Sequence, residues 1–585
     1  MSDSKGNKFD WEILKRILKL ANPYKGLFIS VGILAVVIAP ISAIRPYLIN
    51  IIVDDHIFNN DIPGLIRMSL IFMAAVLAAV LLQYVFIYSV NLLGQQVIRD
   101  LRVRVFNHIL SLKLKFFDKT PIGMITTRTI NDVEAINNVF AQGVVTIVAD
   151  ILSIFAVLGL MFFTSVKLTL ICLITMPLMM LATYVFKEKV KASYQNVRTQ
   201  ISKMNAFLNE RITGMRIVQI FNAEKQEREK FKQINRDYTK ANLNAILYYA
   251  VFYPVVEIIS ALSLALLVWW GAGGYISGTV SFGALVAFPL YLNLLFRPIR
   301  MLADKFNTLQ MGMVAADRVF SVIDNTNKIE DNGSQYIEKL EGDIKFEDVS
   351  FSYDDENYVL HDINFEVKEG STLAIVGSTG SGKSTIINIL NRFYEIQKGR
   401  ISINGTDIRE FNLDSLRSRI AIVLQDVFLF NGNVLENISL RNEDISREKI
   451  IQAAKSIGAD VFIEDLPDGY DYKVMERGAN LSMGQRQLIS FVRALVFDPD
   501  ILILDEATSS IDTETEAIIQ HAIEKLIQKR TSIIIAHRLS TIRNADKILV
   551  LDKGRIKEFG SHDELMKIEE GHYRNMIEMQ FVEMH

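Results

Sequence analysis

The chain has 585 residues, half of them hydrophobic, and a formal net charge of −3. This length exceeds one ordinary core, and the near-neutral charge gives no reason to expect nucleic-acid binding. Such hydrophobicity fits with 22% charged residues only if the two kinds are separated along the chain. Residues 26–305 are indeed dominated by apolar stretches, whereas residues 340–585 have charges throughout. The single cysteine, Cys172, excludes an intramolecular disulfide.

The first twenty residues combine charged and apolar side chains at helical spacing. Trp11, Leu14 and Leu18 alternate with charged residues such as Lys15 and Arg16, so the segment has no signal-peptide core. The pattern predicts an amphipathic helix on the membrane surface.

Six stretches of the first half are apolar enough to cross a membrane, since about 20 apolar residues span roughly 30 Å of hydrocarbon. Lipid cannot satisfy unpaired backbone groups, so all six are predicted to be helices. The predicted spans are residues 27–53, 66–93, 139–163, 166–186, 246–273 and 281–303.

Lys and Arg collect in two long segments, one between the second and third spans and one between the fourth and fifth. Such an excess is typical of cytoplasmic loops, so we expect both termini in the cytoplasm. Both segments keep helical apolar spacing, which predicts that the spans continue as helices. We expect each pair to turn at a non-helical tip, near Pro121-Ile-Gly123 and Thr213-Gly214.

Charged side chains within the spans are costly, about 2.5–3.5 kcal/mol each at the centre on insertion scales, and usually face protein or a water-filled cavity. Glu257 is the best candidate to contact a cationic substrate. An internal hydrogen bond or ion pair between helices fits all of them at least as well. The charged residues in question are Arg45, Asp150, Glu257, Arg297 and Arg300.

Residues 325–340 are polar and turn-rich, which is typical of a linker. Beyond them, residues 343–351 and 363–367 largely alternate apolar and polar side chains, as strands with one buried face do. We therefore predict a membrane domain at 1–324, a linker at 325–340 and a second domain at 341–585.

A glycine-rich segment follows the apolar run Leu373–Val376 and precedes a helical pattern, which predicts a phosphate-binding loop. Its glycines let backbone N–H groups converge on phosphate oxygens, Lys383 reaches the terminal phosphates, and the Ser384 hydroxyl can bind Mg²⁺. An ordinary surface loop is the alternative. The residues expected to bind ATP or GTP are Gly377, Ser378, Thr379, Gly380, Ser381, Gly382, Lys383, Ser384 and Thr385.

A second apolar run, Ile501–Leu504, ends in two carboxylates. Asp505 is expected to hold the Mg²⁺ shell, and Glu506 to orient or activate the attacking water. The alternative is a purely structural strand that happens to end in two acidic residues. A phosphate loop in the same chain disfavours this alternative.

The motif Leu481-Ser-Met-Gly-Gln485 opens a helical run, Arg486–Leu495. At this motif the chain resembles the ATP-binding cassette (ABC) transporters, whose signature is LSGGQ, and its six spans resemble those of exporter half-transporters. The resemblance covers essentially the whole chain. It implies an α-helical membrane domain of six transmembrane helices with long cytoplasmic extensions, fused to an α/β P-loop ATPase domain.

The resemblance also implies roles for single residues. Tyr353 would stack on adenine, Gln425 would sense Mg²⁺ and the membrane domain, and His537 would contact the γ-phosphate as the third catalytic residue beside Glu506. Strand packing, a polar surface position and a hydrogen-bonded histidine are the plain alternatives for these three. Other implied positions are Ser384, Gln425 and Asp505 for Mg²⁺, Asp512 in the D-loop, Ser482, Gly484 and Gln485 in the signature, and Phe116–Gly123 with Ile130–Asp132 in the first coupling region.

A helix dipole acts only near its terminus, so the signature must lie against a nucleotide to matter. In the family's arrangement that nucleotide is held by the partner, so the resemblance implies that a chain with one phosphate loop and one signature works as one of two chains. The signature departs from the family pattern at Met483, and Met475 stands where exporters often have a glycine before Glu-Arg-Gly. Methionine prevents close backbone approach, so we expect this signature to serve a weakened site. The expected partner is a homologous chain with a normal signature and a degenerate carboxylate after its Walker B strand.

We therefore expect ATP-hydrolysis-driven export of a small amphipathic or hydrophobic compound (multidrug type) across the bacterial cytoplasmic membrane, with ATP and Mg²⁺ as cofactors. The ATPase domain would lie in the cytoplasm, and membrane lipids but no nucleic acid would be partners. A lipid flippase or a peptide exporter is the alternative within transport. No protease domain precedes the spans, which disfavours a cargo-processing peptide exporter. A regulatory membrane ATPase that moves no cargo is the alternative outside transport.

Overall fold

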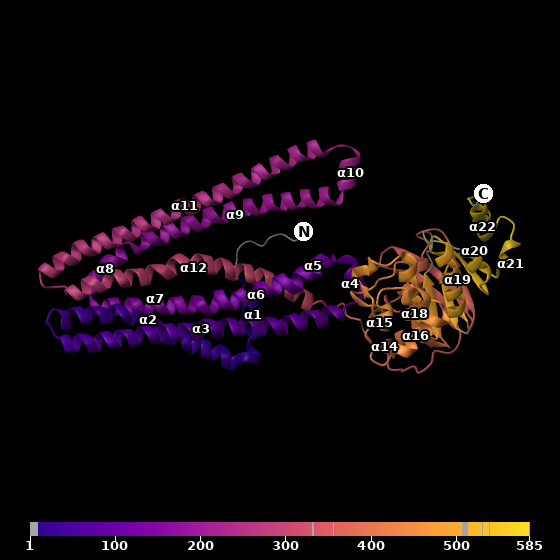
Figure 1. The fold of residues 1–585 in the computed structure, drawn as a ribbon, viewed down its shortest axis with the longest axis horizontal. Helices are drawn as coiled ribbons and strands as arrows, with labels where there is room; N and C mark the ends of the chain where they lie inside the picture. Colours follow the sequence, from indigo (N-terminus) through magenta and orange to yellow (C-terminus); the bar gives the residue numbers. More distant parts are fainter. Residues whose placement is uncertain are drawn as a thin grey trace. The chain divides into compact units, whose positions relative to one another are not determined.

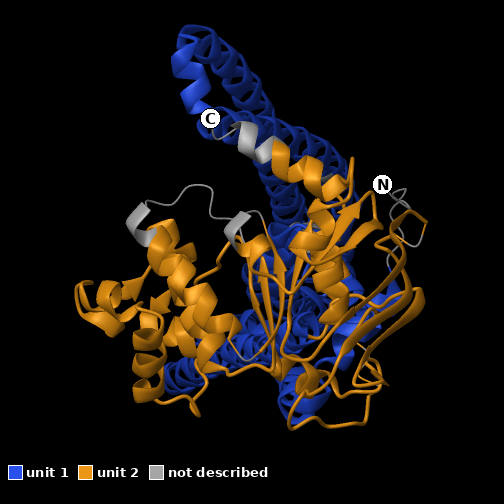
Figure 2. Ribbon diagram, turned by 90° about the vertical axis from the view of Figure 1, so that its right-hand side faces the viewer, with its two compact units in different colours: residues 1–110, 121–325 blue, residues 111–120, 326–585 orange. Residues whose placement is uncertain are grey.

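The computed structural model describes residues 10–329, 331, 333–354, 356–505, 513–528, 530–536 and 539–583. The chain divides into two compact units, drawn in different colours in Figure 2. Unit 1 comprises residues 1–110 and 121–325, and unit 2 comprises residues 111–120 and 326–585. The short segment 111–120 therefore packs with the C-terminal unit, although both of its ends continue into helices of unit 1.

Unit 1 consists of long helices, several of which lie side by side (Figure 1). Within the described residues, six helical stretches are long and apolar enough to cross a membrane, which confirms the number and order of the predicted spans. The helices of unit 1 are α1 (Trp11–Lys19), α2 (Lys25–Ile51), α3 (Ile62–Leu110), α5 (Ile122–Thr127), α6 (Val133–Asn138), α7 (Val144–Thr164), α8 (Val166–Ile174), α9 (Met176–Thr213), α10 (Met215–Ile220), α11 (Glu224–Ile276) and α12 (Phe282–Ile323).

The longest helices of unit 1 are much longer than a membrane requires. α3 has 49 residues and α11 has 53, whereas about 20 residues span the hydrocarbon. This confirms that the spans continue as helices beyond the membrane. α9 and α11 run side by side and are joined through α10 (Figure 1).

The prediction of non-helical tips is confirmed only in part, because non-helical residues occur at both turns but do not make up the whole of either tip. α9 does end at Gly214, and Pro121 does precede α5, but Gly123 lies inside α5. Both tips contain a six-residue helix, α4 (Leu114–Lys119) in unit 2 and α10 in unit 1. A breaker ends one helix without preventing the next, and neither short helix contains Gly or Pro.

Unit 2 is a mixed α/β domain, as predicted. A six-stranded sheet has the order β12-β11-β3-β10-β9-β6, and a four-stranded sheet has the order β2-β1-β4-β5. The strands are β1 (Ile344–Ser352), β2 (Tyr358–Val367), β3 (Thr372–Val376), β4 (Lys398–Ile403), β5 (Thr406–Asp407), β6 (Ile420–Val423), β7 (Gly432–Asn433), β8 (Lys473–Val474), β9 (Ile501–Asp505), β10 (Thr531–Ile535), β11 (Lys547–Asp552) and β12 (Arg555–Gly560). The remaining helices are α13 (Lys383–Leu390), α14 (Leu413–Ser418), α15 (Val434–Ser439), α16 (Arg447–Ser456), α17 (Asp460–Glu464), α18 (Met483–Val496), α19 (Thr513–Ile527), α20 (Leu539–Arg543), α21 (His562–Met566) and α22 (His572–Glu583).

The six-stranded sheet is buried on both faces. Leu373 and Ile375 of β3 belong to one apolar cluster, together with Ile386 of α13, while Ala374 and Val376 belong to another. This alternation follows from the two-residue period of a strand. Helices and the four-stranded sheet thus enclose β3 and hold the segment that follows it in place.

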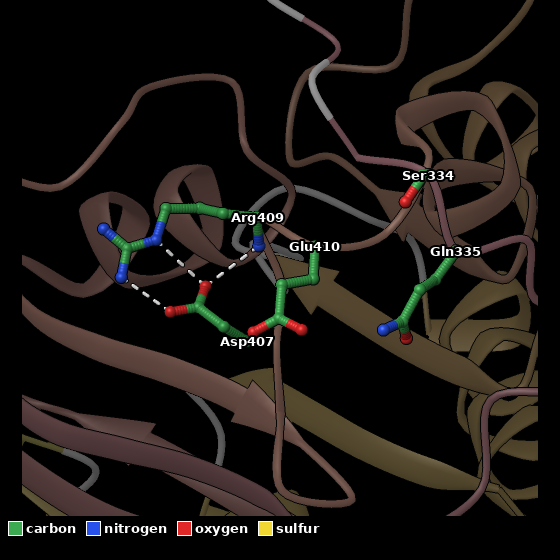
Figure 3. A pocket seen from close by; sticks show the side chains of 5 residues that line it. All are labelled: Ser334, Gln335, Asp407, Arg409 and Glu410. Carbon is green, nitrogen blue, oxygen red and sulfur yellow. Dashed lines mark hydrogen bonds and ion pairs between the residues drawn. The ribbon is translucent and has the colours of Figure 1, made fainter.

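The described residues of the expected linker lie in unit 2 from Thr326 onward. Ile337 donates its N–H to Ser415 Oγ at 2.6 Å, and Ser415 Oγ donates to the Ile337 carbonyl at 3.0 Å. Gln335 forms a bridge with Phe411. The linker also lines a small pocket, in which Arg409 donates to both carboxylate oxygens of Asp407 (Figure 3).

Candidate functional site

The predicted nucleotide-binding parts meet at one edge of the six-stranded sheet. β3, β10, β9 and β6 are adjacent and parallel, with Ile375 beside Ile535 and Ile535 beside Asp505. The phosphate loop follows β3, Asp505 ends β9, and Gln425 lies two residues after β6. Ligands of open α/β sheets bind at such carboxyl ends. Glu506, Asp512 and His537 lie outside the described residues.

The phosphate loop has the backbone that its glycines permit. Gly377, Gly380 and Gly382 all have positive φ, and Gly382 forms the N-cap of α13. A Cβ at Gly377 would lie 2.1 Å from the carbonyl oxygen of Leu551, so no other residue fits there without a shift. The loop therefore leads its backbone N–H groups directly into the N-terminus of a helix.

Lys383 is held over the loop. Its Nζ donates to the carbonyls of Gly377 at 2.8 Å and Ser378 at 2.9 Å. Burial lowers the pKa of Lys383, which the negative charge of Asp505 partly opposes. Ser381 Oγ is buried without a hydrogen-bond partner in the described part of the chain. A buried hydroxyl without a partner, beside a lysine ammonium and exposed loop residues, fits the phosphates of a nucleotide.

Tyr353 lies beside this loop. Its hydroxyl is 3.2 Å from Thr385 Oγ1, and Asn388 Nδ2 donates to it at 3.4 Å. The ring packs edge-on against Phe351, with 4.8 Å between centroids. Packing and a position next to the phosphate loop thus occur together, so the two interpretations of Tyr353 do not exclude each other.

The candidate Mg²⁺ ligands carry the oxygen groups that this ion prefers, namely a hydroxyl, an amide and a carboxylate. Ser384 and Gln425 are exposed, and Asp505 is half-buried at the end of β9. The residue types therefore fit the ion.

The signature forms the N-terminus of α18. This helix begins at Met483, three residues earlier than predicted, because Ser482 and Gln485 form a reciprocal capping box. Gly484 is buried and Met483 half-buried. Among the described residues, no hydrogen bond joins Ser482 or Gln485 to the phosphate loop.

The segment before the signature is held by Arg486 and Asn480. Arg486 donates to the carbonyls of Gly478 and Leu481, both at 3.3 Å, and Asn480 Oδ1 accepts from the Met475 N–H at 2.9 Å. Met475 itself is 59% exposed. The Met475 side chain is therefore accessible at the surface of the chain.

The charged residues of the spans have different surroundings. Asp150 forms an ion pair with Lys305, which confirms the helix-pairing interpretation for this residue. Glu257 and Arg297 are exposed within this single chain, and Arg45 donates to the Ser42 carbonyl at 3.3 Å. The side chain of Arg300 lies outside the described part.

Two residues beside the site were missed at the sequence level. Tyr394 packs against Tyr353 and donates a hydrogen bond to Asp118, which lies 276 positions earlier. Phe116–Gly123 pointed to the region of Asp118, but no local pattern marks Tyr394.

Comparison with known proteins is consistent with this arrangement. The family model described as the ABC transporter transmembrane region matches residues 28–299, and the model described as ABC transporter matches residues 360–509.

Similar proteins match almost end to end. The chain is 40% identical over 576 residues to YknV of Bacillus subtilis (strain 168), an uncharacterized ABC transporter ATP-binding protein, covering 98% of this chain and 95% of that one. It is 40% identical over 530 residues to YheH of the same strain, a probable multidrug resistance ABC transporter ATP-binding/permease protein (89% and 78% covered). It is 38% identical over 573 residues to an ATP-dependent lipid A-core flippase of Desulfotalea psychrophila (97% and 99% covered).

Two folded units, six membrane-length helices and full-length similarity lead to one conclusion. The chain belongs to the ABC transporters, as an exporter half-transporter whose ATPase domain drives transport across the membrane.

Proposed function

We propose that the chain exports amphipathic or hydrophobic compounds, using ATP bound at residues 377–385. The proposal is carried by the meeting of the phosphate loop, Asp505 and Gln425 at one sheet edge, in a chain with six membrane-length helices. A similar chain described as a multidrug resistance protein supports the substrate class.

The residues of the site take the following roles. The Lys383 ammonium exchanges the carbonyls of Gly377 and Ser378 for phosphate oxygens, while Tyr353 offers its ring to adenine. Ser384, Gln425 and Asp505 supply oxygen ligands for Mg²⁺. Bound Mg-ATP supplies the phosphoanhydride whose hydrolysis drives the cycle. Glu506 is proposed to orient the attacking water, and His537 to contact the terminal phosphate.

Half-transporters of this family work as dimers, and we propose an unequal one. Met483 at the N-terminus of α18 adds side-chain bulk where the family pattern has glycine, which supports a weakened site at this signature. The partner is proposed to be a homologous chain with a normal signature and a degenerate carboxylate. Both termini and the ATPase domain are placed in the cytoplasm of a bacterial cell.

A second surface supports a dimer. α10 and the residue that follows it present Ile217, Ile220 and Phe221, which are 59%, 59% and 74% exposed. Exposed apolar side chains gathered on one short helix mark an interaction site. The other tip helix, α4, packs within an ATPase unit, so we assign α10 to the ATPase domain of the second chain.

Steady-state ATPase measurement tests the catalytic roles. Glu506→Gln is expected to reduce turnover on the order of 100-fold while leaving ATP binding intact. Glu569→Gln, on the exposed surface of unit 2, is the matched control and should behave as wild type. ATPase activity near wild type in Glu506→Gln would contradict the role of this carboxylate.

Inside-out vesicles containing the co-purified complex separate the transport alternatives. ATP-dependent accumulation of ethidium, lost with Glu506→Gln, supports multidrug export. Movement of a fluorescent phospholipid without dye accumulation would instead favour a lipid flippase, a candidate supported by the similar lipid A-core flippase. Movement of neither probe, with an ATPase that responds to a bound protein, favours a regulatory ATPase.

Mass spectrometry of the complex purified from its native membrane tests the unequal dimer. A homologous second chain with a normal signature is expected. A dimer of two identical chains that hydrolyses ATP at both sites would overturn the proposal. Met483→Gly should raise ATP turnover at the weakened site.

A further inference from the structure

Tyr394 connects two parts of unit 2 that the proposed function treats separately. Its ring meets the ring of Tyr353 edge-on, with 5.0 Å between centroids and 87° between planes. Phe351 closes the group, 5.9 Å from Tyr394 and 4.8 Å from Tyr353. Edge-to-face contacts depend on ring orientation, so a rotation of one ring disturbs the next.

The opposite end of Tyr394 binds a tip helix. Its hydroxyl donates to the carboxylate of Asp118 in α4. A tyrosine hydroxyl is protonated at neutral pH, and burial, and secondly the hydrogen bond to Asp118, raise the pKa of Tyr394 further. Tyr394 therefore touches the proposed adenine-binding ring at one end and α4 at the other.

The contact between Tyr394 and Asp118 matters because α4 is joined at both ends to helices of unit 1. α4 follows α3 and precedes α5, two helices of unit 1. The backbone just before α4 is attached to the linker, because the Lys113 N–H donates to the Asn327 carbonyl at 3.0 Å and the Ile329 N–H donates to the Ser111 carbonyl at 3.1 Å. A displacement of α4 is thus passed covalently to α3 and α5.

Stability does not require the bond between Tyr394 and Asp118. The Asp118 side chain is exposed and Tyr394 is only half-buried, so water can satisfy either group when the other is removed. The hydrogen bond therefore contributes little to folding. Because Tyr394 also contacts Tyr353, the proposed adenine-binding residue, a role in passing the effect of nucleotide binding to α4 explains the bond better.

We propose that Tyr394 is a positioning residue that transmits occupation of the adenine-binding surface at Tyr353 to α4 through its hydrogen bond to Asp118. The inference rests on the proposed ATP site. Adenine stacked on Tyr353 restrains the orientation of that ring. The edge-to-face contact then restrains the ring of Tyr394, and the hydrogen bond from its hydroxyl to Asp118 restrains the position of α4.

Hydrogen exchange of the full-length complex in lipid nanodiscs, with and without Mg-ATP, tests this directly. A peptide covering residues 372–390 reports nucleotide binding, and a peptide covering residues 111–127 reports the response of α4. In the wild type, ATP should slow exchange in both peptides. Lys383→Ala should abolish both effects.

Three variants isolate the hydrogen bond. Tyr394→Phe keeps the ring and removes the hydroxyl, so it should retain the ATP effect at 372–390 and lose more than half of it at 111–127. Asp118→Ala should behave in the same way. Asp118→Asn keeps an oxygen that accepts from Tyr394 and should restore the response, which a purely structural effect of charge would not do.

The exchange results distinguish failure of the Tyr394 inference from failure of the proposed nucleotide site. The inference is overturned if Tyr394→Phe retains the response at 111–127, if it loses the response at 372–390 as well, or if Asp118→Asn is as impaired as Asp118→Ala. It is also overturned if wild-type 111–127 never responds while 372–390 does. If ATP slows neither peptide in the wild type, the proposed nucleotide site itself is wrong.

Discussion

The two short tip helices, α4 and α10, resemble each other in length and differ in their surroundings. Each has six residues and joins two of the long helical stretches in the sequence. α4 belongs to unit 2, where Tyr394 binds its Asp118 and the linker pairs with the preceding backbone. α10 belongs to unit 1, and its apolar side chains Ile217 and Ile220 are each 59% exposed.

This difference indicates how a half-transporter divides its contacts. One tip already lies on an ATPase unit of its own chain, whereas the other presents apolar side chains that water solvates poorly. We propose that a second chain supplies the surface that α10 lacks. Conformational changes in either ATPase domain would then reach the membrane helices of both chains.

Loss of the Lys383 ammonium should have the largest effect, because the proposed response of α4 depends on nucleotide bound at this loop. Lys383→Ala is expected to lower ATPase activity on the order of 100-fold or more, since it removes a charge aimed at the phosphates. Exchange at residues 372–390 and 111–127 should then stop responding to ATP.

The matched control for this substitution is Lys567→Ala, which changes an exposed lysine of the same unit. It should leave ATPase activity and both exchange responses unchanged. A response at residues 111–127 that persists in the Lys383→Ala protein would show that α4 does not depend on this nucleotide.

Much of the fold and part of the candidate site could be predicted from the sequence. The six spans, the phosphate loop and the strand ending at Asp505 follow from apolar length, glycine spacing and a short continuous apolar run, which are local properties. The breaks at Gly214 and before α5 were also visible. These features survive in the fold because tertiary packing reinforces the local preference.

The rest depends on contacts that no local pattern contains. Tyr394 and Asp118 are 276 positions apart, and although Asp118 lies in the predicted coupling region, no local pattern pairs it with Tyr394. The helical nature of the tips was missed because glycine and proline mark where one helix ends without excluding another. α18 begins at Met483 because a capping box of Ser482 and Gln485 extends it, an effect that apolar periodicity does not reveal.

Equal truncations at the two tips should have unequal effects on stability. Leu112, just before α4, is 2% exposed, so Leu112→Ala removes buried contacts and should cost about 2–5 kcal/mol. Ile217→Ala removes atoms that are already largely in water and should cost little in the isolated chain. Calorimetry of the purified chain, with ~2–4 °C lost per kcal/mol in a unit of this size, distinguishes the two.

The contrast between the tips is wrong if Ile217→Ala lowers the unfolding temperature as much as Leu112→Ala does. Such a result would mean that α10 is packed in the single chain.

In the assembled dimer, α10 should matter for activity instead. Ile217→Ser together with Ile220→Ser makes the tip polar, and each buried isoleucine contributes about 1.5–3 kcal/mol to a contact. We expect at least a tenfold loss of stimulated ATPase activity, roughly 1.4 kcal/mol in coupling, with nucleotide binding unchanged. Ile568→Ser, at an exposed position of unit 2, is the matched control. Unchanged stimulation in the double variant would remove α10 from the proposed interface.

The smallest effect concerns the region just before the linker. Arg16 of α1 donates to both oxygens of Asp324 at 2.6 and 2.5 Å, and its guanidinium lies 4.0 Å from the Phe320 ring centroid. Both charged side chains are about half-exposed, so Arg16→Ala should cost less than about 1 kcal/mol. High salt should reduce the difference further.

The pH dependence of this pair has a definite sign. Hydrogen bonding to Arg16 lowers the pKa of Asp324 below its usual 3.8. The stabilisation is therefore complete above that pH and disappears as pH falls through the lowered value, where Asp324 becomes protonated. A double-mutant cycle of Arg16→Ala with Asp324→Ala, followed by calorimetry, isolates the coupling between the two residues. If Arg16→Ala still destabilises the chain after Asp324 is protonated, then the Phe320 contact, and not the charge, holds α1 against α12.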